Sequence, residues 1–121
     1  MYICRQNCPS HLKFHADETS IAFSLAPDLV NWQQIGHLFE QQPAWTRSSF
    51  WAPELFHRNG KTYAYYTARR KTDGTSYIGV ATADKPEGPY TDHGPIVEYG
   101  TEAIDAFVLE DAGELYISWK A

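Results

Sequence analysis

The chain has 121 residues, of which 43% are hydrophobic and 21% charged, with 15 acidic and 10 basic side chains. This length corresponds to one ordinary domain, and this composition is typical of globular proteins, so disordered and collagen-like classes are excluded. The net charge of −5 argues against nucleic-acid or anionic-membrane binding as the main activity. Aromatic residues reach 15%, which favours β-structure and a surface that stacks on flat ligands.

The N-terminal segment carries Cys4, Cys8, His11 and His15. Zinc sites of this type usually separate the cysteine and histidine pairs by roughly a dozen residues, and the shorter spacing here makes a tetrahedral cage hard to close. We therefore expect reduced thiols and surface histidines, and no metal site. No basic segment followed by an apolar stretch is visible, so a cytoplasmic location is the default expectation, although a truncated gene would lack a secretory signal as well.

Strand-like runs alternate with turn residues along the chain, and no segment keeps a helical period, which predicts an all-β protein. The clearest hairpin joins residues 51–56 to residues 61–67 through Asn59-Gly60. This dipeptide is preferred where both central residues of a tight turn need a positive φ. A second hairpin pairs residues 65–67 with residues 77–81.

The second half of the chain repeats the pattern of the first at an offset of about 53 residues. Residues 50–56 match residues 103–109, and Asn59-Gly60 matches Ala112-Gly113. A period near 50 residues with about four strands in each unit suits the blade of a β-propeller. Because propellers close with roughly four to eight blades, we expect a piece of a larger ring. We place the rest of a first blade in residues 1–49, a second blade in residues 50–102 and the start of a third in residues 103–121.

Three segments carry a more specific pattern, and their order and spacing strengthen it. Residues 24–32 read Ser-Leu-Ala-Pro-Asp-Leu-Val-Asn-Trp, residues 51–54 read Trp-Ala-Pro-Glu, and residues 104–116 begin Ile-Asp-Ala-Phe. Together with the Asn-Gly-Lys and tyrosine pattern at 59–66, they resemble glycoside hydrolase family 43, whose members are five-bladed propellers that cleave xylosides and arabinofuranosides. One departure is Ala106, where the family usually has proline; its loss is expected to loosen the preceding aspartate without changing its charge.

The resemblance implies three carboxylates at the mouth of the propeller channel. A first-blade aspartate is the base, an aspartate opening the third blade tunes and orients the acid, and a fourth-blade glutamate is the acid. By motif, Asp105 matches the tuning aspartate, whose like charge raises the pKa of the acid. Its spacing alone predicts that Asp105 is a residue at the start of a strand that caps a turn. The base and the acid are expected outside this chain, and Glu87, although followed by Gly-Pro as the acid often is, is expected in an outer loop.

Two further residues are candidates for substrate binding. Trp51 matches the tryptophan that borders the sugar pocket of the family, and a core tryptophan at a strand start is the open alternative. Glu54 follows on the same strand and is expected on the same face, where it could line the channel or form a satisfied buried carboxylate. Phe50 and Phe107 are expected in the core.

The resemblance therefore implies a fragment of an O-glycosyl hydrolase that acts with inversion on terminal xylosyl or arabinofuranosyl linkages of plant-type oligosaccharides or glycosides. It implies no cofactor, apart from a channel cation such as calcium in the intact protein, and no nucleic-acid or membrane partner. The chain alone is expected to be inactive. A non-catalytic carbohydrate-binding propeller, a fructan-cleaving relative and a scaffold whose aromatic residues are all core remain as alternatives.

Overall fold

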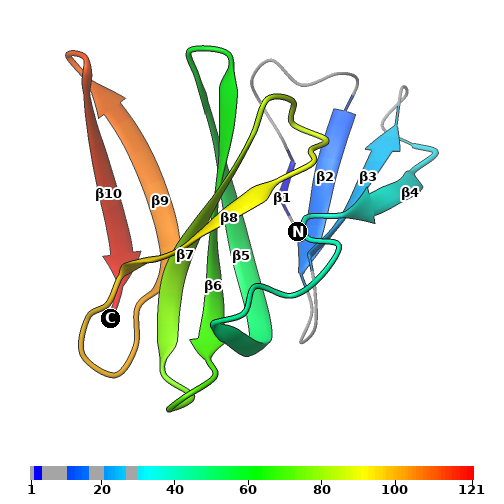
Figure 1. Cartoon of the computed structure of the whole chain (residues 1–121). Helices are drawn as coiled ribbons and strands as arrows, with labels where there is room; N and C mark the ends of the chain where they lie inside the picture. Colours follow the sequence, from blue (N-terminus) through cyan, green and yellow to red (C-terminus); the bar gives the residue numbers. More distant parts are fainter. Residues whose placement is uncertain (1, 4–10, 17–20, 27–29) are drawn as a thin grey trace.

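The computed structural model describes residues 2–3, 11–16, 21–26 and 30–121, which form three antiparallel sheets (Figure 1). The first sheet contains β1 (Tyr2–Ile3), β2 (His11–Ala16), β3 (Ile21–Ala26) and β4 (Gln33–His37). The second contains β5 (Thr46–Arg58), β6 (Lys61–Arg70), β7 (Ser76–Ala83) and β8 (Thr91–Val97). The third contains β9 (Ile104–Asp111) and β10 (Glu114–Lys120). The all-β prediction is confirmed.

Each sheet is a simple meander in which neighbouring strands follow one another along the chain. The sheets lie side by side in chain order, and β9 contacts β5, β6 and β7 (Figure 1). The division of the chain into blades at positions 50 and 103 stays a prediction. In the described part of the chain, no helix is long and apolar enough to cross a membrane.

The two hairpin turns confirm the predicted turn chemistry. Asn59 and Gly60 between β5 and β6 have φ values of 53° and 74°. Ala112 and Gly113 between β9 and β10 have φ values of 51° and 82°. Two consecutive positive φ angles give a turn whose twist matches that of the flanking strands. The repeated sequence pattern therefore corresponds to a repeated hairpin.

An aromatic cluster around Tyr66 fills the space between the first and second sheets. Tyr66 is fully buried, and its ring centroid lies 5.1 Å from that of Phe39, 5.9 Å from that of Trp45 and 6.0 Å from that of Phe50. Such aromatic pairs contribute about 0.5–1.5 kcal/mol each beyond the area they bury. Phe50 is 1% exposed, so its predicted place in the core is confirmed.

Polar and steric constraints fix the orientation of the Tyr66 ring. Its hydroxyl donates a hydrogen bond of 2.5 Å to the Asp92 carboxylate of β8. Gly79 of β7 leaves room for the ring, because a Cβ there would lie 2.7 Å from Tyr66 Cζ and 2.8 Å from Trp45 Cζ2. Real Cβ atoms do not approach other atoms so closely, so a side chain at position 79 would displace the cluster.

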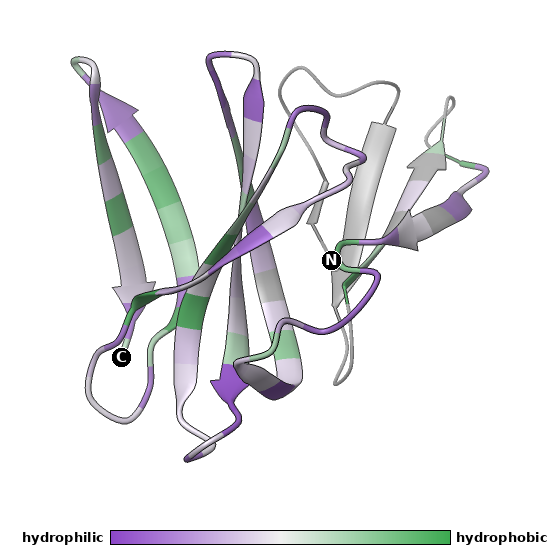
Figure 2. Cartoon of the chain, in the orientation of Figure 1, coloured by the Kyte–Doolittle hydropathy of each residue, from purple (hydrophilic) through white to green (hydrophobic). Residues whose placement is uncertain are grey.

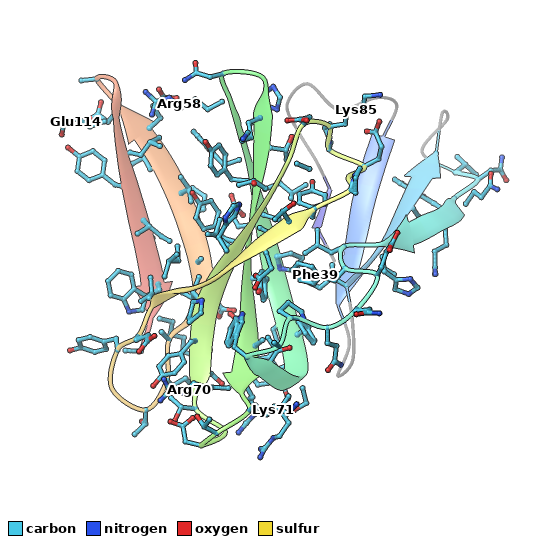
Figure 3. All side chains as sticks on the ribbon, in the orientation of Figure 1. Phe39, Arg58, Arg70, Lys71, Lys85 and Glu114 are labelled. Atoms are coloured by element: carbon cyan, nitrogen blue, oxygen red, sulfur yellow. The ribbon has the colours of Figure 1, made fainter. Side chains whose placement is uncertain are left out.

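A smaller core lies between the second and third sheets. It contains Ile78, Ala103 and Ala106, with Tyr65, Val97 and Ile117 packed against it. At the far end of the interface, Arg58 Nη2 donates to the Gly113 carbonyl at 3.4 Å, and Arg58 Nε lies 3.9 Å from Glu110 Oε1. Figure 3 shows Arg58 and Glu114 at this same end, on either side of the β9–β10 turn. The third sheet is therefore attached to the second along its length.

The outer face of the third sheet is apolar and uncovered. Phe107, Leu109 and Tyr116 are 54%, 54% and 52% exposed, and Figure 2 shows the hydrophobic residues along β9 and β10. The prediction that Phe107 lies in the core is wrong for this structure. Side chains alternate along a strand, and because Ala106 and Val108 face the second sheet, Phe107 points away from it.

Replacing Tyr66 with phenylalanine tests the buried hydrogen bond. Tyr66→Phe should lower the free energy of unfolding at pH 7 by about 1–2 kcal/mol, because Asp92 loses its donor. Burial and, second, Asp92 raise the pKa of Tyr66 above its usual value of 10.0. The unfolded chain releases this proton near pH 10, so stability should fall as pH rises above about 10. In Tyr66→Phe, the loss of stability between pH 7 and pH 10.5 should be smaller than in the parent.

Urea denaturation at pH 7 and pH 10.5 measures both effects. Tyr99→Phe is the matched control, because Tyr99 is 59% exposed, and it should change neither value. Equal stabilities of Tyr66→Phe and the parent at pH 7 would contradict the role assigned to this hydroxyl.

Candidate functional site

Trp51 lies in β5, on the face of the second sheet that is turned toward β9. It is partly buried and pairs in register with Thr67 of β6. The guanidinium carbon of Arg69 lies 5.8 Å from the centroid of its ring. A cation at this distance from an indole face is attracted by the ring's quadrupole. The backbone of Trp51 is therefore fixed by its pairing with β6, and its ring is in contact with the guanidinium of Arg69.

Glu54 shares this face through a bulge in β5. Residues three apart in a regular strand would point to opposite faces. Here the register shifts between Trp51 and Glu54, and their partners in β6 are Thr67 and Tyr65, which are two residues apart. An extra residue in β5 thus returns Glu54 to the face of Trp51. Trp51 and Glu54 therefore share one face of the sheet, as expected, but they do so because of the bulge and not because of regular strand alternation.

Asp105 is the second residue of β9 and has an unusual backbone conformation. Its φ is 56°, and its side chain is exposed. A left-handed residue other than glycine costs about 1–2 kcal/mol, although aspartate tolerates this region better than most. Such strain is concentrated at functional sites. A proline at position 106 would favour an extended φ at Asp105, and Ala106 does not impose that restriction.

Thr67 connects Asp105 to Trp51. The backbone N–H of Asp105 donates to Thr67 Oγ1 at 3.3 Å, and Thr67 is the register partner of Trp51. The contacts of β9 with β5 and β6 place the start of the third sheet against this part of the second. The backbone of Asp105 therefore lies against the face of the second sheet that carries Trp51 and Glu54.

The three consecutive basic residues Arg69, Arg70 and Lys71, at the end of β6, have different surroundings. Arg69 lies within β6 over Trp51, and its Nη1 donates to the Gly74 carbonyl at 3.2 Å. Arg70 pairs with Asp73 at 2.5 Å and lies 4.3 Å from the Tyr77 ring centroid. The hydrogen bond from Arg70 lowers the pKa of Asp73 to about 2. Lys71 alone is an exposed turn residue, next to Arg70 in Figure 3.

Sequence reasoning missed Thr67 and Arg69 as parts of the site. The signal was present in the strand period, because Tyr65, Thr67 and Arg69 are two residues apart and share one face of β6. Burial raises the pKa of Tyr65, the partner of Glu54, so this tyrosine stays protonated at neutral pH.

Glu87 lies away from these residues, in the loop between β7 and β8. It lines a cavity of about 740 Å³ together with Phe39, Glu40, Tyr90 and Asp92. Asp92 is the acceptor of Tyr66, so this cavity belongs to the face turned toward the first sheet. The side chain of Glu87 therefore lies on the opposite face of the second sheet from Trp51.

Most of the N-terminal cysteine and histidine residues that were considered as metal ligands lie outside the described part of the chain. Cys4 and Cys8 are among the residues that the structure does not describe, and only the backbone of His11 and His15 is described, in β2. Among the described residues, no group of three or more His, Cys, Asp or Glu side chains could hold a metal ion. The expectation that the protein needs no cofactor stays a prediction.

These residues have the chemistry needed to bind a sugar, but they do not provide all the groups needed to hydrolyse a glycosidic bond. An indole offers an apolar face to sugar C–H groups, and carboxylates accept hydrogen bonds from sugar hydroxyls. Glycoside hydrolysis needs two carboxyl groups that flank the scissile bond, one as acid and one as base or nucleophile. Asp105 and Glu54 lie on the same side of the sheet, but the motif assigns neither role to them.

Comparison with known proteins identifies the family of the chain. The sequence model of the glycosyl hydrolases family 43 matches residues 10–121. The chain is 44% identical over 75 residues to xylosidase/arabinosidase 43A of Humicola insolens, which covers 60% of this chain and 22% of that protein. It is 38% identical over 86 residues to a probable arabinan endo-1,5-α-L-arabinosidase B of Aspergillus oryzae, which covers 67% of this chain and 24% of that protein.

Solved structures show the same fold. A thermostable family-43 glycoside hydrolase superposes with a TM-score of 0.84 at 28% identity, over 98% of this chain and 39% of that chain. The GH43_1 enzyme from Xanthomonas citri, complexed with xylose, superposes with a TM-score of 0.75 at 30% identity, over 95% of this chain and 37% of that chain. The three sheets are thus part of a five-bladed β-propeller.

The chain belongs to the glycosyl hydrolases family 43. It spans about a quarter of the length of the curated relatives that it matches. The family match does not favour a fructan-cleaving relative, a non-catalytic carbohydrate-binding propeller or a scaffold whose aromatic residues are all core.

Replacing Arg69 tests its contact with Trp51. Arg69→Met removes the guanidinium but keeps an unbranched side chain, so it should shift the assigned Nε1–H resonance of Trp51 and cost about 0.5–1 kcal/mol of stability. Arg70→Met is the matched control, since it should leave the Trp51 resonance in place and return the pKa of Asp73 from about 2 toward its ordinary value near 4. An unchanged Trp51 resonance in Arg69→Met would contradict the contact.

Proposed function

We propose that this chain is part of a glycoside hydrolase that cleaves O-glycosyl bonds of xylosides or arabinofuranosides with inversion of configuration. The observation that carries the proposal is the placement of Asp105 beside the Thr67–Trp51 pair, at the start of the third sheet. By their motifs, Asp105 and Trp51 match an aspartate and a tryptophan of the family that this chain belongs to. The backbone N–H of Asp105 is hydrogen-bonded to Thr67, the register partner of Trp51, in a member of the family.

Asp105 acts on the general acid rather than on the substrate in this proposal. Asp105 is exposed, and in this proposal its carboxylate supplies a negative charge close to a glutamic acid of another blade. A like charge disfavours ionisation, so the acid keeps its proton near neutral pH and can deliver it to the leaving oxygen. The base activates a water molecule on the opposite side of the sugar, about 6.5–9.5 Å from the acid.

Trp51 and Glu54 bind the sugar in this proposal. The indole packs against the C–H face of the ring, while Arg69 holds the indole in place. Glu54, brought to the same face by the bulge in β5, accepts hydrogen bonds from sugar hydroxyls. The proposed substrate class, plant xylosides and arabinofuranosides, follows the names of the relatives, which include a xylosidase/arabinosidase and a β-xylosidase.

The complete activity needs more of the ring than these residues supply. The chain covers 39% of a matched family structure, and the outer face formed by Phe107, Leu109 and Tyr116 is apolar and exposed. In a closed propeller, a following blade covers such a face. We propose that the base and the acid come from parts of the ring outside this chain, and that the substrate is bound without a cofactor.

Turnover measurements test this proposal. The purified 121-residue chain should not hydrolyse 4-nitrophenyl β-xyloside or α-arabinofuranoside, because it lacks an acid and base pair, whereas a complete ring that contains it should. In that ring, Asp105→Asn should lower kcat by about a hundredfold or more. Asp111→Asn is the matched control, since Asp111 is an exposed aspartate at the end of the same strand.

Two outcomes would overturn the proposal. One is turnover by the purified chain that disappears in Asp105→Ala. The other is a complete ring whose first product, followed by proton NMR, keeps the anomeric configuration of the substrate.

A further inference from the structure

We propose that Thr67 is a positioning residue that holds the backbone of Asp105 in place for catalysis. This inference rests on the proposed function, since it assigns a supporting residue to the same site. The contact is the 3.3 Å hydrogen bond from the Asp105 N–H to Thr67 Oγ1, which joins two different sheets across 38 positions of sequence.

The hydroxyl of Thr67 is suited to hold a neighbouring backbone. Thr67 is 1% exposed, in the middle of β6, with strands paired on both sides of it. A buried hydroxyl needs a hydrogen-bond partner, and the oxygen of threonine can accept from a backbone N–H. Because threonine is branched at Cβ, its χ1 angle is restricted, so the hydroxyl has a defined direction.

Asp105 needs such a support because its own backbone is strained. Its φ of 56° lies in the left-handed region, where an extended strand would not place it. Position 106 is alanine, which does not restrict the backbone of the preceding residue as a proline would. The hydrogen bond that the Asp105 N–H donates to Thr67 of the neighbouring sheet therefore supplies a restraint that the local sequence lacks.

The position of the Asp105 backbone determines where its carboxylate points. The carboxylate tunes the acid through space, and its effect falls with distance. Displacements of about 1 Å in a supporting residue can reduce catalysis about a hundredfold. Loss of the Thr67 hydroxyl should therefore act on the acid without removing any charged group.

The first measurement is amide hydrogen exchange in the 121-residue chain, with three variants. Thr67→Val removes the hydroxyl at nearly constant shape, Thr67→Ser keeps it, and Thr62→Val makes the same change at another buried threonine of β6, whose hydroxyl contacts His57. Exchange at the Asp105 amide should accelerate about tenfold in Thr67→Val. It should stay within about twofold of the parent in the other two. Exchange at Val108, paired with Ile117, reports whether the hairpin is intact.

The second measurement is the pH profile of kcat in a complete ring that contains the chain. Displacing the Asp105 charge lowers the pKa of the acid, so the alkaline limb should move to lower pH in Thr67→Val and return in Thr67→Ser. A merely structural loss would lower activity at all pH values without moving this limb.

Three outcomes separate this inference from the proposed function. Unchanged exchange at Asp105 in Thr67→Val would overturn the contact. Accelerated exchange with an unmoved alkaline limb would overturn the positioning role. A parent ring without any hydrolysis would overturn the proposed function itself, and the exchange result would still decide whether Thr67 holds Asp105.

Discussion

Strand β6 has a neighbouring sheet on each of its faces, and the rest of the structure depends on the alternation of its side chains. Ala64, Tyr66 and Ala68 enter the core toward the first sheet, while Tyr65 and Thr67 face the third. A shift of one residue would exchange these two sets. The 2.5 Å hydrogen bond between Tyr66 and Asp92 helps to fix the register, because it is satisfied only when Tyr66 faces the first sheet. The same register directs Thr67 toward Asp105.

The site is built where the strands depart from regular geometry. Ser49 in β5 and Asp105 in β9 have positive φ angles of 60° and 56°, and β5 changes register before and after Trp51. A bulge or a left-handed residue aims a side chain in a direction that a regular strand does not allow. The surrounding cores supply the stability that offsets this local strain. In this way the regular pairing of β6 with β7 supports the irregular strand β5, which carries Trp51 and Glu54.

The sequence predicted the parts of the fold that local chemistry determines. Asn59-Gly60 predicted a turn because both positions need positive φ, and the repeat at Ala112-Gly113 predicted the second. Phe107 was misplaced because its burial depends on the neighbouring sheets and not on its own strand. Arg69 was missed because a basic run next to a turn is usually solvated. The bulge that brings Glu54 to the face of Trp51 could not be predicted, because the two-residue alternation of a regular strand does not indicate where an extra residue is inserted. The roles of Asp105, Trp51 and Glu54 stay predictions, since they depend on a substrate and on further blades.

The most direct test of this account is a crystal structure of a complete ring that contains the chain, soaked with xylose or arabinose. The account predicts a sugar packed on the indole of Trp51, with Asp105 N–H still bonded to Thr67 and its carboxylate turned toward a glutamic acid of another blade. A sugar bound elsewhere, with the indole of Trp51 covered and the Asp105 carboxylate capping a local turn, would contradict it.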